Sequence, residues 1–181
     1  MEPIESKIRE LLGPLVYGAD EETLAHVVLR ELDRCRLSLS VAEGVTGGAL
    51  NLALSGEPWP GMRWFQGGLI ARTPRAELWA GLQETTRRAK GSEGEEAARE
   101  LAEAVRLRMG TDLGLATVGR DDEGPGAGQV WVALSHAGGC EIRHQHWFCA
   151  AAEVRSRTAK LALDATRLFL AGQNGFGSHP A

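Results

Sequence analysis

The sequence predicts an α/β fold with three layers, in which a mixed, mostly parallel sheet lies between two layers of helices and ends in a C-terminal hairpin. Helical and strand patterns alternate through the first two thirds of the chain, as in sheets whose parallel strands are joined by helices. Two strand-like runs, 130–135 and 140–148, then flank a turn at 137–139 and predict the hairpin. A length of 181 residues and a hydrophobic fraction of 43% suit one domain with a substantial core.

The first part of the chain is expected to hold two helices, a strand and a tight turn. Residues 2–12 form a short amphipathic helix that ends at Gly13-Pro14. A second helix is expected to begin at a cap on Asp20, because one apolar stripe follows at helical spacing. The stripe consists of Leu24, Val27, Val28 and Leu32. The alternating run 37–41 predicts a strand that leads through the turn 43–46 into another helix.

The later elements follow the same logic. Residues 65–71 predict a strand, and Thr73-Pro74 predicts a helix start with threonine as cap and proline at the first helical position. The charged stretch 83–91 reads as a surface connection. Ser92 and Glu95 have the spacing of a capping box, which predicts a helix running to Gly110.

The C-terminal part contributes a third strand, the hairpin and a last helix. Residues 113–118 predict the strand, and a loop rich in glycine and acidic residues follows at 119–128. The last helix is expected at 151–171. We therefore divide the chain into an N-terminal helix and linker at 1–19, one domain at 20–171 and a disordered tail at 172–181.

Charge and composition exclude several classes of function. The formal net charge is −4 and the basic residues are scattered, so no basic field attracts nucleic acid or an anionic membrane. No run approaches the roughly 18 apolar residues of a membrane span, and we expect no signal peptide because the first residues contain no apolar core. The three cysteines show no CxxC spacing, which indicates free thiols in a reducing compartment. We expect a cytoplasmic protein without cofactor or metal, and a homodimer on general grounds.

The strand-turn-helix segment around 43–48 is the predicted functional site. Sites in open α/β sheets form at the carboxyl ends of strands, where a loop enters a helix. Thr46, Gly47 and Gly48 would present backbone N–H groups there, which favours an anion or an oxyanion. Tight packing of strand on helix requires the same small residues, so the motif alone leaves both interpretations open.

Several stretches, in order, resemble the CinA C-terminal domain family of nicotinamide-nucleotide amidases. Val41-Ala-Glu-Gly-Val-Thr-Gly-Gly48 is similar to the Ala-Glu-Ser-Cys-Thr-Gly-Gly signature of that family. The further matching stretches are Val16–Leu24, Trp64–Ala71, Met109–Ala116 and Gly128–Leu134. The resemblance runs from about residue 11 to 171 and implies the fold of that family.

The resemblance implies an amidase site, but this chain lacks its reactive side chains. What the resemblance implies is hydrolysis of the carboxamide of nicotinamide mononucleotide by a serine and a lysine. The serine position falls on Gly44, the lysine position on Glu77 and a neighbouring tyrosine position on Arg72. The loop residues Asp121, Asp122 and Glu123 would repel a nucleotide phosphate if they faced the pocket. A polar Gly-Asp-Arg motif of the family corresponds to Ala150-Ala-Ala152.

The resulting hypothesis is a catalytically inactive relative with a binding or scaffolding role, which retains a cleft for a nucleotide-like small molecule. The residues expected to bind it are Glu43, Thr46, Gly47, Gly48 and Gly119. The first alternative is an active hydrolase of altered substrate, in which Thr46 acts as nucleophile or Glu77 activates a water. A role as helix N-cap explains Thr46 more simply than a role as nucleophile. The second alternative is a structural interaction module.

Two further groups of side chains, tryptophans and histidines, have both a functional and a structural interpretation. Trp59, Trp64 and Trp79 are expected to gather around the pocket as a lid, an oligomer contact or packing. His144 and His146 lie on one face of a predicted strand, and His136 across the hairpin would be a third metal ligand. The polar outer face of a hairpin explains these histidines more simply.

Overall fold

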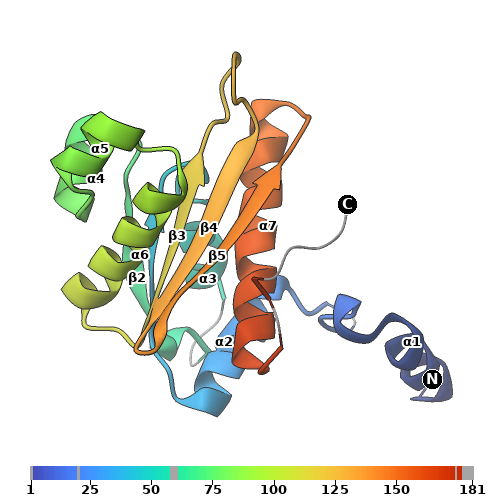
Figure 1. Cartoon of the computed structure of the whole chain (residues 1–181). Coiled ribbons are helices and arrows are strands. Elements are labelled where there is room, and N and C mark those ends of the chain that lie inside the picture. The colour runs from blue at the N-terminus through green and yellow to red at the C-terminus, as the bar shows by residue number, and fades with distance from the viewer. Residues whose placement is uncertain (1, 20, 58–60, 174, 177–181) are drawn as a thin grey trace.

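Figure 1 shows a computed structural model of the chain, which describes residues 2–19, 21–57, 61–173 and 175–176. Five strands form one sheet in the order β2-β1-β3-β4-β5. The strands are β1 (Leu39–Glu43), β2 (Phe65–Ile70), β3 (Leu113–Gly119), β4 (Gln129–His136) and β5 (Gly139–His146). Strand β1 runs parallel to β2 and β3, whereas β4 is antiparallel to β3 and β5. The mixed sheet with its C-terminal hairpin is confirmed, but the expectation of a mostly parallel sheet is wrong, because two strand pairings are parallel and two are antiparallel.

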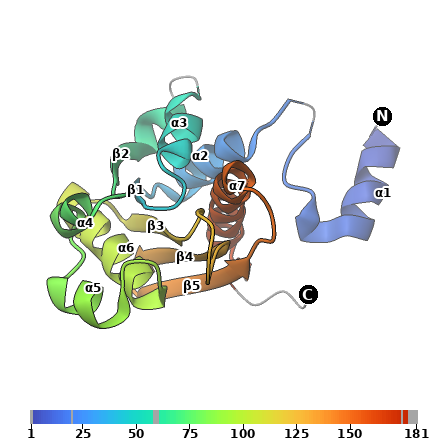
Figure 2. The ribbon, with the colours of Figure 1, turned by 90° about the horizontal axis from the view of Figure 1, so that it is seen from above.

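Helices cover both faces of the sheet, which confirms the three-layer architecture (Figure 2). The helices are α1 (Glu2–Leu12), α2 (Leu24–Cys35), α3 (Ala49–Ser55), α4 (Pro74–Ala80), α5 (Glu84–Lys90), α6 (Glu95–Met109) and α7 (Ala151–Leu170). Two short 3₁₀ helices are η1 (Gly13–Leu15) and η2 (Gly61–Trp64). Helices α2, α3 and α7 lie on one face, and α6 with α4 and α5 lies on the other. Helix α1 projects away from the layers.

The two faces of the sheet are packed with side chains of different size. Branched and aromatic side chains fill the space under α2 and α7, including Leu32, Leu115 and Leu134. The face under α6 is dominated by alanine, so the helix approaches the strands closely. Gly114 marks the closest approach, because a Cβ there would lie 2.1 Å from the Ala102 carbonyl oxygen. This close layer fixes α6 beside the ends of β1 and β3.

Several helix starts and one connection differ from expectation. Helix α2 begins at Thr23, whose hydroxyl accepts the N–H of His26 at 2.9 Å. Asp20, the predicted cap, lies outside the described residues. Helix α6 begins at Gly94 without a side-chain cap, so the predicted capping box is wrong. Residues 84–90 form helix α5 instead of an irregular connection. The predicted cap at Thr73 with Pro74 is confirmed.

The chain after α7 is ordered further than predicted. Gly175 and Phe176 are buried, and Phe176 packs into the core under α2 and α7. Arg143 on β5 donates to the Gly175 carbonyl oxygen at 3.0 Å. The expectation of a disordered tail is therefore wrong for this segment, while residues 174 and 177–181 lie outside the described residues.

Candidate functional site

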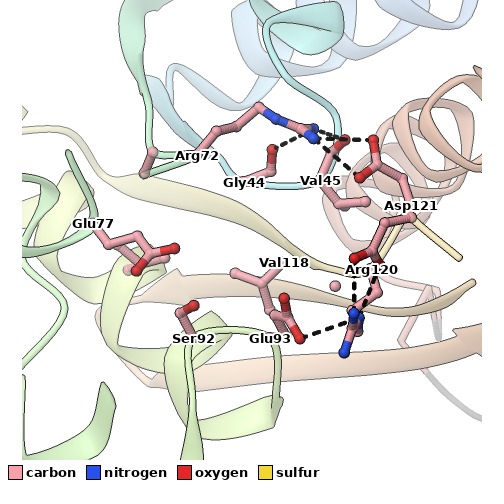
Figure 3. A pocket seen from close by; sticks show the side chains of 13 residues that line it. Gly44, Val45, Arg72, Glu77, Ser92, Glu93, Val118, Arg120 and Asp121 are labelled. Carbon is pink, nitrogen blue, oxygen red and sulfur yellow. Dashed lines mark hydrogen bonds and ion pairs between the residues drawn. The ribbon is translucent and has the colours of Figure 1, made fainter. Parts of the chain in front are cut away.

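A pocket of about 220 Å³ lies where β1, β2 and β3 end at their carboxyl termini (Figure 3). Its floor is apolar and its walls carry charged groups from four separate segments. The lining residues are Gly44, Val45, Ala71, Arg72, Glu77, Ser92, Glu93, Leu101, Val118, Gly119, Arg120, Asp121 and Asp122. The location is the one that open α/β sheets use for ligands.

The turn after β1 is held by the fully buried carboxylate of Glu43. It accepts the backbone N–H groups of Gly48 at 2.9 Å, Leu50 at 3.0 Å and Asn51 at 2.8 Å. The Asn51 side-chain amide donates to the same carboxylate at 2.8 Å. Glu43 therefore satisfies the free N–H groups at the start of α3 and fixes the helix to the strand.

Thr46 belongs to the same internal network. Its Oγ1 lies 2.7 Å from Glu43 Oε2 and 2.7 Å from Thr117 Oγ1, and the residue is 3% exposed. Gly48 is the N-cap of α3 and the helix has no side-chain cap, so the interpretation of Thr46 as N-cap is wrong. The N–H of Gly48 is already bonded to Glu43, so the turn does not offer it to an anion.

Of the predicted site positions, Gly44, Arg72, Glu77 and Gly119 line the pocket, whereas Glu43, Thr46, Gly47 and Gly48 do not. The Gly44 N–H donates to the Thr117 carbonyl oxygen at 2.8 Å. A Cβ on Gly44 would lie 2.9 Å from that same oxygen, closer than Cβ atoms come to a backbone oxygen. The backbone here is thus fitted to a glycine, and a larger residue requires a local shift.

Arg72 crosses the mouth of the pocket and joins two loops. Its Nη1 donates to the Val45 carbonyl oxygen at 2.9 Å, and its Nη2 donates to both carboxylate oxygens of Asp121 at 3.0 and 3.1 Å. Arg155 from α7 also contacts Asp121. Burial raises the pKa of Asp121, but hydrogen bonds and charge from the two guanidinium groups outweigh it and lower this pKa.

The acidic loop therefore faces the pocket, but its charge is largely offset by arginine. Asp122 accepts two hydrogen bonds from Arg120, at 2.9 and 2.7 Å. Glu123 does not line this pocket and instead lines a neighbouring hollow beside Trp147. Asp121 and Asp122 thus line the pocket, the condition under which repulsion of a phosphate was expected, but arginine side chains offset the charge of both.

The remaining wall is acidic: the resemblance points to Glu77, whereas the sequence gives no indication of Glu93. Glu93 lies 3.6 Å from the Arg120 guanidinium. Burial raises the pKa of Glu93, nearby carboxylates raise it further, and Arg120 lowers it less than these raise it. Across the pocket, Oε2 of Glu77 is buried without a hydrogen-bond partner among the described residues (Figure 3).

The sequence does not predict the pocket residues Ser92, Glu93 and Arg120. The spacing of Ser92 and Glu95 predicts a capping box, which places Ser92 at a helix cap and Glu93 inside the box. Both in fact belong to the connection between α5 and α6, which folds over the end of β3. The only available signal was the run of polar residues immediately before an alanine-rich helix.

The predicted tryptophan cluster does not form at the pocket. Trp64 donates its indole N–H to Asp33 at 2.6 Å and packs against the core under α2. Trp79 on α4 is 68% exposed and does not line the pocket. Trp59 lies outside the described residues.

The histidines do not converge on a metal site either. His136 is opposite Gly139 at the turn of the hairpin, whereas His146 is opposite Gln129 at its other end. Among the described residues, no group of three histidine, cysteine, aspartate or glutamate side chains is arranged to hold a metal ion. Within the same part of the chain, no helix combines the length and apolar character needed to cross a membrane.

The fold and the pocket define a class: a three-layer α/β domain with a small polar site at the carboxyl ends of its parallel strands. Residues 21–170 match the CinA C-terminal domain, and the chain belongs to that family. A CinA-like protein of Deinococcus deserti is 35% identical over 161 residues, which are 89% of this chain and 38% of that protein. A CinA-like protein of Gloeobacter violaceus is 37% identical over 74% of this chain and 32% of its own length. The chain thus spans less than half the length of these curated relatives.

Solved structures agree on the fold. The crystal structure of a CinA superfamily protein from Klebsiella pneumoniae superimposes with a TM-score of 0.77 at 22% identity, covering 82% of this chain and 96% of that one. A CinA superfamily protein from Escherichia coli gives a TM-score of 0.75 at 22% identity, covering 88% of this chain and 98% of that one.

Proposed function

We propose that this domain is a ligand-binding relative of the nicotinamide-nucleotide amidases that has lost the serine and lysine chemistry. The supporting observation is the composition of the pocket at the ends of β1 and β3. The position of the nucleophile carries Gly44, which has no side chain, and the position of the base carries the Glu77 carboxylate. Nucleophile and base each contribute orders of magnitude to rate, so losing both leaves little amidase activity.

The burial of Thr46 argues against a substitute nucleophile. Its hydroxyl is bonded to Glu43 and Thr117, and the residue does not line the pocket. A substrate carbonyl therefore has no approach to this oxygen. The open pocket, which neither Trp64 nor Trp79 lines, favours a bound ligand over a purely structural module.

One observation supports a second candidate function, hydrolysis by an activated water. Glu93 faces the pocket and has a raised pKa, as a carboxylate acting in proton transfer does. Glu77 lines the same pocket, so a pair of carboxylates is available. This candidate differs from the first in requiring turnover, and one assay separates them.

The test is ammonia release from nicotinamide mononucleotide by the purified natural protein. We expect no release above that of the buffer. Turnover that disappears in Glu93→Gln would establish the water mechanism, and turnover that disappears in Thr46→Val would establish a substitute nucleophile. Either result would overturn the non-catalytic proposal.

A double variant, Gly44→Ser with Glu77→Lys, asks whether the scaffold still supports amidase chemistry. Because a Cβ at position 44 is placed 2.9 Å from the Thr117 carbonyl oxygen, Gly44→Ala is the matched control for the fold. Ammonia release by the double variant alone would show that the cleft remains competent and that its reactive groups have been lost.

A further inference from the structure

The pocket carries an imbalance of charge that its own residues do not resolve. Four carboxylates and two guanidinium groups line it. Asp121 is bonded to Arg72 and to Arg155 from α7, and Asp122 is bonded to Arg120, so the charges of these two carboxylates are offset. With Glu77 and Glu93, four carboxylates stand against three guanidinium groups, which leaves one negative charge in excess.

Glu77 is the least satisfied of these carboxylates. Glu93 lies within 4 Å of Arg120, but no arginine or lysine of the described residues comes that close to Glu77. The charge of Glu77 is the smallest of the causes that raise the pKa of Arg87, and Arg87 donates its hydrogen bonds to Glu84. Figure 3 shows Glu77 on the opposite side of the pocket from the guanidinium groups of Arg72 and Arg120.

One oxygen of Glu77 is buried and without a donor, which is costly for a charged group. Glu77 lines the pocket, and the terminal torsion of a glutamate is broad, so its carboxylate is free to orient toward a bound group. Ser92 adds a hydroxyl acceptor on the same wall, while Ala71, Leu101 and Val118 supply an apolar floor. The missing partner is thus a hydrogen-bond donor with positive charge and a short apolar body.

We propose that the pocket binds a small organic monocation, a primary ammonium or guanidinium group on a short carbon chain, with the Glu77 carboxylate as its counter-ion. This inference rests on the proposed function, namely that the pocket is a binding site. It adds the sign of the ligand charge. A volume of about 220 Å³ limits the ligand to a small molecule.

The probes are n-butylammonium and butyrate, a cation and an anion of matched size, at equal ionic strength. The amide signals of Gly44 and Gly119 in a ¹H–¹⁵N correlation spectrum report on the pocket, because both residues line it. We expect butylammonium to shift these signals saturably and butyrate to leave them unchanged. Added salt should weaken the binding of the cation.

Glu77→Gln keeps the shape and removes the charge, and we expect it to bind butylammonium at least about tenfold more weakly. Glu103→Gln on the exposed side of α6 makes the same change in net charge and should bind as the natural protein does. Glu93 is exposed on the wall of the pocket, and Glu93→Gln should also weaken the binding of butylammonium. This variant replaces Glu77→Gln in the test if Glu77→Gln does not fold. Equal binding by natural protein, Glu77→Gln and Glu93→Gln would overturn the inference.

The outcomes separate this inference from the proposed function. Shifts with butyrate and none with butylammonium would overturn the cation preference while leaving a binding pocket in place. No shift with either probe would count against the pocket as a binding site and overturn both. The ammonia assay is independent of all these results.

Discussion

At the scale of single residues, Glu43 is the polar anchor of the turn after β1. Its carboxylate accepts hydrogen bonds from three backbone N–H groups and from the Asn51 amide while fully buried. In Glu43→Gln, an amide NH₂ faces those donors, and we expect the free energy of unfolding to fall by about 2–4 kcal/mol. Urea denaturation measures it, with the exposed Glu103→Gln as control, expected to change by less than about 0.5 kcal/mol. Equal stability of the two variants would show that the network is not an anchor.

Residue by residue, the sequence predicts the turn after β1, but only some of the residues predicted for the site line the pocket. Glu43, the last residue of β1, turns its carboxylate toward the start of α3, whereas Gly44 lies in the turn that follows and borders the pocket. The resemblance identified Gly44 and Glu77, and both line the pocket. Arg120 was not predicted, because its place opposite Glu93 depends on how two distant segments meet.

At the scale of elements, Asp121 ties the loop after β3 to Arg72 beyond β2 and to Arg155 on α7. We expect Asp121→Asn to lower the free energy of unfolding by about 1 kcal/mol at neutral pH, a modest value because both arginines are at least 36% exposed. The pKa of Asp121 is lowered in the folded protein. Its stabilisation is therefore complete above the ordinary value of 3.8 and is lost as the pH falls through the lowered value.

Denaturation of natural protein and Asp121→Asn across a range from about pH 7 to about pH 2.5 measures this difference. The gap should close at the acidic end, since the other carboxylates titrate alike in both proteins. A gap that is constant with pH would show that the side chain acts by shape and not by charge.

Short sequence motifs predict the boundaries of some helices but not of others. Thr73-Pro74 carries its cap and its first helical residue in two adjacent positions, so the start of α4 could be read directly. Helix α5 has no buried residue, so its sequence shows no apolar period and predicts a surface connection instead of a helix. Hydrogen bonds from Arg87 and Arg88 lower the pKa of Glu84 to about 2 and add modest support to the helix, and Thr86 donates to Glu100 on α6.

At the scale of the whole molecule, the layer order was predictable because strands and helices alternate, whereas the closure of the core by the C-terminal segment was not. Phe176 stands among glycine and polar residues that give no periodic signal, yet it is 8% exposed and packs into the core under α2 and α7. Phe148 at the end of β5 is 89% exposed, so the chain offers a matched pair of phenylalanines.

We expect Phe176→Ala to lower the free energy of unfolding by up to about 3 kcal/mol, and Phe148→Ala to change it by less than about 0.5 kcal/mol. This loss of unfolding free energy lies at the low end of the range for a buried phenylalanine replaced by alanine, because the segment after α7 can detach while the sheet stays intact. Thermal and urea denaturation measure both variants. Hydrogen exchange in Phe176→Ala should rise first in the last turn of α7, where Arg34 donates to the Leu170 carbonyl oxygen at 3.0 Å. Equal, small effects from both substitutions would mean that the core is closed without this segment.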